Sequence, residues 1–137
     1  MSATTVERAT EKQLHARVSQ RNHADRILAR AAYLPRHEQL LLDQIYRHGM
    51  TITDTARLLD KPPRTVQRRL RNLLNRLNSD LFAFVATQLD LLPPDVRPTA
   101  KSVALHGHSL RKTARQTGIS LHRVREHMGV VKALARL

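Results

Sequence analysis

The chain repeats itself after 58 residues, and this repeat constrains the fold more than any other feature. A shift of 58 positions, with no gap, places Leu34-Pro35 on Leu92-Pro93 and His48-Gly49 on His106-Gly107. The same shift aligns further cap and helix positions: Thr51 with Ser109, Ile52 with Leu110, Thr55-Ala56-Arg57 with Thr113-Ala114-Arg115, Val66 with Val124, and Leu70 with Met128. Caps, turns and inward positions are what a shared fold preserves. The repeat therefore predicts two copies of one structural unit.

The first copy contains the stretch Thr51–Leu70, which predicts two short helices joined by a tight turn. Thr51 suits the N-cap of the first helix, and Asp54 is placed to complete a capping box. Pro62-Pro63 ends this helix, and Pro63 suits the first position of the next one, where no backbone donor is needed. Helical spacing predicts the inward faces, made of Ile52, Thr55, Ala56 and Leu59 on the first helix and Val66, Leu70 and Leu73 on the second.

The second copy, Ser109–Met128, has the same plan with different turn chemistry. Gly118 occupies the turn, where a positive φ is easily adopted. Ser120 suits the cap of the second helix. Val124, Met128 and Val131 are predicted to face inward, with Ser120, His122, Arg125 and Glu126 outward and Arg123 at the edge.

The other segments are also helical in pattern, so the chain is predicted to be all-α. Only four glycines and 3% aromatic residues leave cores of Leu, Val, Ile and Ala. We expect an N-terminal helix over residues 1–33, with a solvated first half and a second half that packs on the rest. A first helix-turn-helix unit follows at 34–78, with a leading helix over 36–48 that Gly49 ends. The apolar residues 79–92 form a connecting helix, and a second helix-turn-helix unit covers 93–137. The leading helix of this second unit is short, so residues 81–92 are a candidate part of its core. We predict a break near Asn78, and one continuous helix over 63–91 is the alternative.

The net charge of +13 over 137 residues indicates a polyanionic partner, most often nucleic acid. Between Lys61 and Arg76 there are six basic residues and no acid. An exposed row of Arg and Gln on a short second helix is what reading base edges in the major groove requires. The base-edge or groove candidates are Arg64, Gln67, Arg68 and Arg71 in the first unit and His122, Arg123, Arg125 and Glu126 in the second.

Other polar residues of both units are better placed for the DNA backbone. The phosphate candidates are Arg57, Lys61, Arg69, Ser109 (through its helix end), Lys112 and Arg115. Glu126 is open to two interpretations. It either accepts a hydrogen bond from a cytosine amine and excludes other bases, or it pairs with Arg123 or Arg125.

The residues Leu34-Pro35, Leu41, Ile45, Gly49, Thr51, Ala56, Leu59, Thr65-Val66 and Leu70 together resemble the C-terminal promoter-reading domain of bacterial sigma factors. The second copy, with Thr113-Ala114, Thr117-Gly118-Ile119-Ser120 and Val124, is similar to the same domain and to the helix-turn-helix of resolvases and response regulators. In the sigma family this domain binds promoter DNA in the major groove and touches RNA polymerase. The resemblance therefore implies double-stranded DNA, and RNA polymerase, as partners.

Two departures limit this resemblance. Residues 1–33 have neither the length nor the aromatic cluster of the promoter-melting domain of sigma factors. The first turn has Pro62-Pro63 where the family favours Gly-Ile-Ser. The sequence therefore predicts a sigma-like double DNA-binding module and not a complete sigma factor.

The composition argues against several other functions. The chain has no cysteine, so disulfides and thiolate metal sites are excluded. Its eight histidines include no pair at i, i+4 on one helix, and they are interpreted as surface groups without a metal. No paired carboxylates, phosphate loop or activated nucleophile indicates an enzyme or a bound cofactor. No apolar run approaches a membrane span and no signal peptide is evident, so a cytoplasmic location is the expectation.

The sequence thus predicts a transcriptional regulator that binds duplex DNA. Two recognition helices in one chain are expected to enter successive major grooves about 34 Å apart. The alternative is a protein-interaction module for RNA polymerase or another regulator, in which residues 81–92 form the apolar surface that contacts the partner. A third interpretation is that only one unit reads DNA, while the second is a structural copy or a partner site.

Overall fold

The computed structural model describes residues 2–137, with side chains from Thr10 onward, and within this range it is all-helical with no β-strand. The first part contains α1 (Ser2–Ala31), α2 (Arg36–Leu42), the π-helical turn η1 (Asp43–Arg47), α3 (Ile52–Leu59) and α4 (Pro63–Leu77). The second part contains α5 (Asp80–Thr87), the 3-10 turn η2 (Leu89–Leu91), α6 (Arg97–Ala100), the π-helical turn η3 (Lys101–Leu105), α7 (Leu110–Thr117) and α8 (Leu121–Ala135). The prediction of an all-α fold is confirmed.

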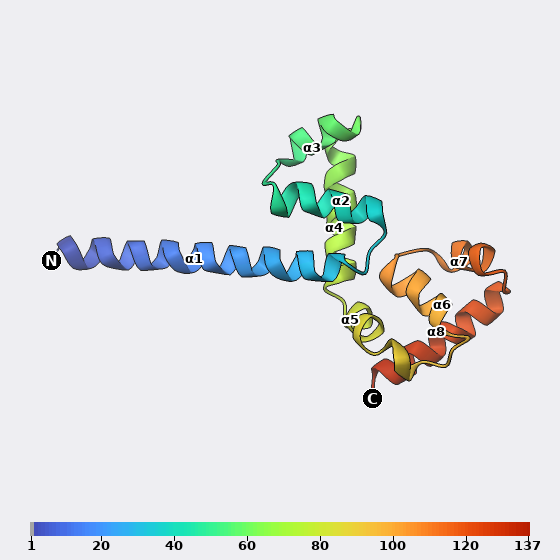
Figure 1. The fold of residues 1–137 in the computed structure, drawn as a ribbon. Helices are drawn as coiled ribbons and strands as arrows, with labels where there is room; N and C mark the ends of the chain where they lie inside the picture. Colours follow the sequence, from blue (N-terminus) through green and yellow to red (C-terminus); the bar gives the residue numbers. More distant parts are fainter. Residues whose placement is uncertain (1) are drawn as a thin grey trace.

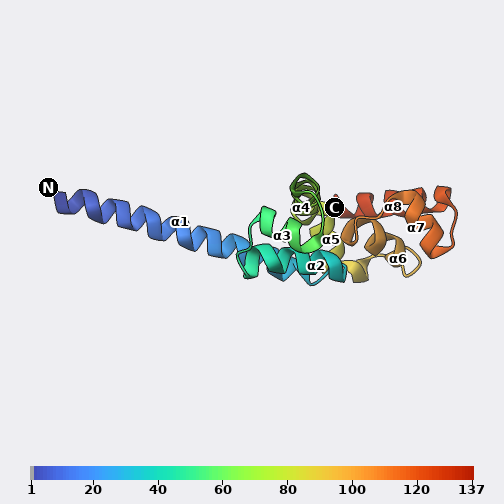
Figure 2. The same ribbon diagram turned by 90° about the horizontal axis from the view of Figure 1, so that it is seen from above.

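The helices form two lobes and one projecting arm (Figure 1). Lobe 1 consists of α2 to α4, together with the end of α1 that packs on them, and lobe 2 consists of α5 to α8. Seen from above, α1 leaves lobe 1 in the direction away from lobe 2 (Figure 2). Residues 10–23 of α1, which we call the arm, are all exposed, whereas Ile27 and Ala31 near its end are buried.

The 58-residue shift also relates the helices of the two lobes. The bounds of η1, α3 and α4 coincide after the shift with those of η3, α7 and α8. The correspondence extends further back than residue 34, because α5 (80–87) falls on residues 22–29 of α1, and the buried Val85 falls on the buried Ile27. Each set of matching helices is thus preceded by a helix that packs against it. Residues 79–92 belong to lobe 2 in this respect and do not merely connect the lobes.

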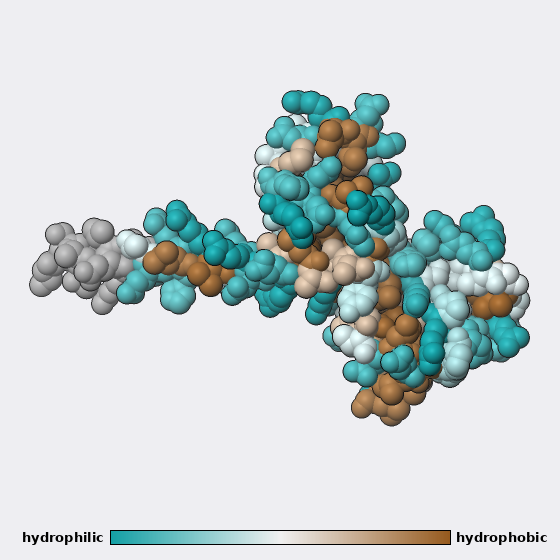
Figure 3. Space-filling model, in the orientation of Figure 1, coloured by the Kyte–Doolittle hydropathy of each residue, from teal (hydrophilic) through white to brown (hydrophobic). Residues whose placement is uncertain are grey.

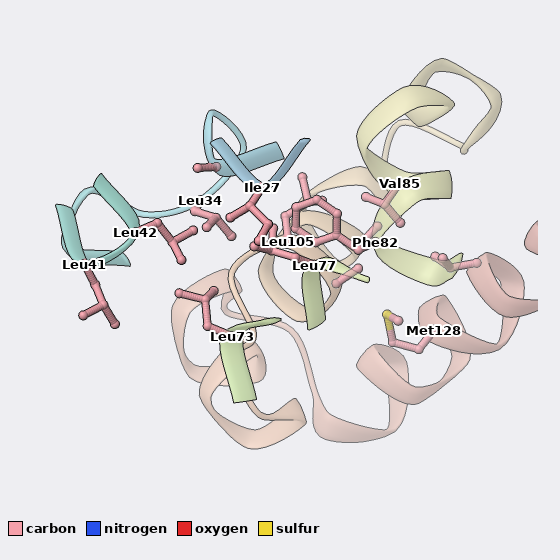
Figure 4. Packing of buried hydrophobic residues seen from close by; sticks show 14 of the residues in the cluster. Ile27, Leu34, Leu41, Leu42, Leu73, Leu77, Phe82, Val85, Leu105 and Met128 are labelled. Carbon is pink, nitrogen blue, oxygen red and sulfur yellow. The ribbon is translucent and has the colours of Figure 1, made fainter. Parts of the chain in front are cut away.

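One continuous apolar core joins the two lobes. It runs from Ile27 through Leu42, Leu73 and Leu77 to Leu105 and Val131. Figure 4 shows Leu77, Phe82 and Leu105 close together where the lobes meet. Phe82 is fully buried, and its ring meets Tyr33 edge to face with the ring centroids 6.4 Å apart.

The apolar segment after Asn78 differs from the predicted single helix. The predicted break is present, since α4 ends at Leu77 and α5 begins at Asp80 with Ser79 as its cap. However, α5 ends at Thr87, and a 3-10 turn replaces its predicted last part. Phe82, Val85 and Leu92 are all buried. These three side chains are therefore part of the core, whereas Leu91 is 64% exposed and Leu81, Phe84 and Leu89 are only partly buried.

A charged contact supports the lobe junction. Arg76 of α4 forms an ion pair with Glu38 of α2, and both side chains are less than one-fifth exposed. The Arg76 guanidinium also lies against Gly107 of lobe 2, so closely that a Cβ on residue 107 would overlap it. Gly107 has φ +70°, the left-handed region that favours glycine. The backbone conformation therefore favours glycine there, and a larger residue would have to displace the Arg76 side chain.

The variant Gly107→Ala is expected to be less stable than Gly49→Ala, which is its matched control. Gly49 lies at the equivalent position with φ +67° but has nothing within 4 Å of an added Cβ. The left-handed backbone alone costs about 1–2 kcal/mol in each variant. Displacing Arg76 from Glu38 should cost Gly107→Ala about 1–3 kcal/mol more. Urea titrations measure both values, and equal losses would show that Arg76 moves aside freely.

Candidate nucleic-acid interface

The α3–α4 pair of lobe 1 is built by local signals that the sequence contains. The Thr51 hydroxyl accepts a hydrogen bond from the backbone N–H of Asp54 at 3.1 Å, so Thr51 caps α3 as predicted. Pro63 occupies the first turn of α4. Val66, Leu73 and Leu77 of α4 are buried. Leu59 differs from the prediction, because it is 41% exposed at the end of α3 instead of facing inward.

The turn between these helices has the same backbone form in both lobes, despite different residues. Asp60 adopts φ 54°, ψ 48°, and its equivalent Gly118 adopts φ 76°, ψ 8°, both left-handed. Pro62 (φ −61°, ψ 142°) and its equivalent Ser120 (φ −67°, ψ 155°) are both extended. The two prolines therefore still allow a left-handed residue followed by an extended one before the next helix, because the fixed φ of Pro62 suits that position.

The four base-edge candidates of lobe 1 lie together on the outer side of α4. All are exposed and are spaced at three and four residues, so they share a face opposite Val66; they are Arg64, Gln67, Arg68 and Arg71. Asn75 continues this row one turn further, which the spacing alone could have indicated. None of the three arginines pairs with a carboxylate in the described part of the chain. Their charge is therefore available to an external anion.

The corresponding face of α8 is different. Ser120 caps α8 by accepting from the N–H of Arg123 at 3.1 Å, and the predicted inward residues Val124, Met128 and Val131 are buried. The outward candidates His122, Arg123, Arg125 and Glu126 are all exposed. The 58-residue shift places His122, Arg125, Glu126 and Gly129 where α4 has Arg64, Gln67, Arg68 and Arg71. This row of α8 thus holds one arginine and one acid, whereas the row of α4 holds three arginines and no acid.

Glu126 pairs with a residue that the sequence interpretation did not select. Its carboxylate lies 2.8 Å from Nε2 of His122, one turn earlier on α8. The suggested ion pair of Glu126 with Arg123 or Arg125 is not formed among the described residues. His122 and Glu126 are 83% and 61% exposed, so this contact is a surface pair of small energetic weight.

The phosphate candidates are exposed in both lobes. Arg57, Lys61, Lys112 and Arg115 lie on or directly after α3 and α7, near the turns that precede α4 and α8. The Ser109 hydroxyl accepts from the N–H of Lys112 at 3.1 Å and so serves as the N-cap of α7. Arg69 is also exposed, but it lies on a different side of α4 and borders a groove between α2 and α4.

The prediction that the histidines are surface groups is wrong for His127. His127 is only 6% exposed, and its Nδ1 lies 2.9 Å from Oγ1 of the buried Thr99. Its Nε2 is 3.6 Å from a carboxylate oxygen of Asp95. A second buried polar cluster joins Ser102 Oγ to Thr113 Oγ1 at 2.8 Å and to His108 Nδ1 at 3.1 Å. These clusters satisfy buried polar atoms inside lobe 2.

The two histidines beside Gly107 have lowered pKa values. Burial is the main cause of the lowered pKa of His106, and the cations Arg76 and Lys101 act in the same direction against Glu38. Burial is also the main cause for His108, whose pKa is lowered further by Lys112 and by His106. A lowered pKa means that the folded protein disfavours the protonated imidazole.

Acidification from pH 7.5 to 5.5 is therefore expected to destabilise the fold. As the pH falls below the ordinary histidine pKa of about 6.5, the unfolded chain binds protons that folded His106 and His108 resist, so stability decreases with decreasing pH. The double variant His106→Gln/His108→Gln should show a flatter dependence over this range. Thermal unfolding across the pH series measures both, and an unchanged slope in the variant would contradict the assignment.

Comparisons with known proteins add no assignment to this geometry. The chain matches no protein-family model, no curated protein and no solved structure. Within residues 2–137, no helix combines the length and apolar character needed to cross a membrane. The described residues also contain no group of three or more His, Cys, Asp or Glu side chains that could hold a metal ion.

Proposed function

We propose that this chain binds double-stranded DNA sequence-specifically and regulates transcription, as a tandem helix-turn-helix protein related to the promoter-reading part of sigma factors. The observation that carries the proposal is the exposed row Arg64, Gln67, Arg68 and Arg71 on α4. Arginine donates two parallel hydrogen bonds to guanine O6 and N7, and glutamine pairs similarly with adenine. The α3–α4 pair, its turn and its buried face present this row on a rigid support.

In this proposal the two lobes have different roles on DNA. α4 reads base edges, because its outer row holds three arginines without carboxylate partners. Lobe 2 mainly supplies attraction to the phosphates, since residues 80–137 carry nine Lys and Arg residues against four acids. Lys112 and Arg115 on α7 are the phosphate ligands of this lobe. The matching row of α8 contributes less direct reading, because it holds one arginine, Arg125, and the acid Glu126.

Selection of bound sequences from a random duplex pool, followed by fluorescence anisotropy on the selected site, tests this function. Affinity should fall steeply between 50 and 200 mM salt, because each neutralised phosphate contributes roughly −0.9 to the slope of log K against log salt. Four cationic phosphate ligands (Arg57, Lys61, Lys112 and Arg115) give a slope of about −3 to −4.

The variant Lys61→Ala should reduce the magnitude of that slope by about 1 and weaken binding to all sequences alike. Lys132→Ala is the matched control, because Lys132 is an exposed lysine of α8 outside the candidate set, and it should leave the slope unchanged. If the DNA affinity of the unmodified protein hardly changed with salt concentration, the DNA-binding proposal would be wrong. A protein-interaction module would then be the better function.

A further inference from the structure

Lobe 1 has an open groove between α2 and α4, with a volume of about 460 Å³. Its apolar floor is formed by Leu41, Leu59, Val66 and Leu73, and Arg69 lies at its border. A groove of this volume is large enough to accept aliphatic side chains from another molecule.

The equivalent positions in lobe 2 are filled. The 58-residue shift places Arg69 on His127 and Leu41 on Thr99. His127 is buried and its ring contacts Thr99, whereas Arg69 is exposed and turned outward. The groove is therefore a structural difference between lobe 1 and lobe 2.

The arm of α1 presents a second apolar surface that no other described element covers. Leu14 and Val18 are 55% and 54% exposed, and their spacing of four residues places them on one face. Figure 3 shows an apolar patch on the arm surrounded by hydrophilic residues. The buried Ile27 and Ala31 lie on a different face, so this stripe does not continue the contact of α1 with lobe 1. A helical segment without tertiary contacts is marginally stable in water and gains most from docking.

We propose that the arm of one molecule docks in the α2–α4 groove of a second copy, so that the chain dimerises by exchanging arms. Leu14 and Val18 enter the groove and cover its leucine and valine floor. Glu11 lies one turn before Leu14 on the same face of the arm, and its carboxylate pairs with Arg69 at the border of the groove. Reciprocal exchange gives a closed twofold dimer.

The geometry of α1 selects a second copy as the occupant. α1 is one continuous helix to Ala31, and it leaves lobe 1 in both views (Figures 1 and 2). Leu14 lies 13 residues before Ile27, or about 20 Å along the helix axis. The arm cannot reach the groove of its own chain without breaking α1. The apolar floor suits the aliphatic pair Leu14 and Val18, and Arg69 at its border suits the single carboxylate on that face of the arm, Glu11.

Light scattering on the full chain, without nucleic acid, tests this proposal independently of DNA binding. The expected mass is twice the 15.6 kDa of one chain. Leu14→Asp in the arm and Leu59→Asp in the groove should each weaken the dimer at least tenfold. Leu58→Asp is the matched control, because Leu58 is 61% exposed beside Leu59 but does not line the groove. Arg69→Glu should also weaken the dimer, and Glu11→Arg in the same chain should restore it.

Cross-linking distinguishes this contact from other modes of association, since the natural chain has no cysteine. A mixture of Leu14→Cys and Asn72→Cys chains should form a disulfide between the two variants, because Asn72 lines the groove and is exposed. A monomer at all concentrations would overturn the proposal. A disulfide formed only between two Leu14→Cys arms would also overturn it, because the arms would then pair with each other.

Discussion

The variant Phe82→Ala is expected to lose about 3–5 kcal/mol of unfolding free energy, which is the range for removing a buried phenylalanine side chain. Phe82 is fully buried where α5 meets the rest of the core. Its removal leaves a cavity beside Leu77 and Leu105 and removes the edge-to-face contact with Tyr33. Total stabilities of about 5–15 kcal/mol are typical, so this single change removes a large share.

Chemical denaturation followed by circular dichroism measures this loss, and Phe84→Ala is the matched control. Phe84 is only partly buried on the same helix, so its truncation should cost clearly less. Because one apolar cluster spans both lobes, we expect a single cooperative transition that moves as a whole in Phe82→Ala. Two separate transitions, with only one displaced, would show that the lobes have independent cores.

Exchanging charge between the equivalent positions 68 and 126 is expected to have opposite effects on DNA binding. Arg68→Glu removes a base-edge donor and places an acid near the phosphates. This change should cost about 2–4 kcal/mol, or roughly 30- to 700-fold in affinity for the preferred sequence. Glu126→Arg removes the acid of α8 and adds a cation, so affinity should increase and the salt slope should grow by about 1–2.

Both substitutions are at exposed helix positions, so each should change the unfolding free energy by no more than about 0.5 kcal/mol. Anisotropy titrations against the selected duplex and against an unrelated duplex separate base reading from phosphate attraction. A loss in Arg68→Glu that is equal on both duplexes would reduce Arg68 to a phosphate ligand. If Glu126→Arg weakened binding as strongly as Arg68→Glu, Glu126 itself would be a base reader.

Local sequence signals predicted much of the secondary structure and the exposure of the candidate site. Thr51 and Ser120 cap their helices, Gly49 and Gly118 adopt left-handed backbones, and α4 ends directly before Asn78. Each of these features depends on residues within about one helical turn, so a short stretch of sequence is sufficient. Helical spacing likewise separated the buried face of α4 from its arginine row.

Only the tertiary structure decided which residues from distant parts of the chain contact each other. The sequence predicted a connecting helix over residues 79–92 that was also a candidate part of the second unit's core. Only the fold shows that α8 and η3 pack around Phe82 and Val85 of this segment. The sequence placed His127 on the surface, although Thr99, 28 positions earlier, holds the ring inside lobe 2. The contact of Arg76 with Glu38 and Gly107, and the groove beside Arg69, also join separate elements.

The sequence by itself therefore determined the repeat, the helix ends and the exposed arginines of this protein. Caps, turns and periodicity act over three to four residues and can be recognised one stretch at a time. Burial and open grooves depend on which side chains arrive from elsewhere in the chain. Leu59 and His127 show this. The sequence predicted an inward Leu59 and a surface His127, but Leu59 is 41% exposed and His127 is only 6% exposed.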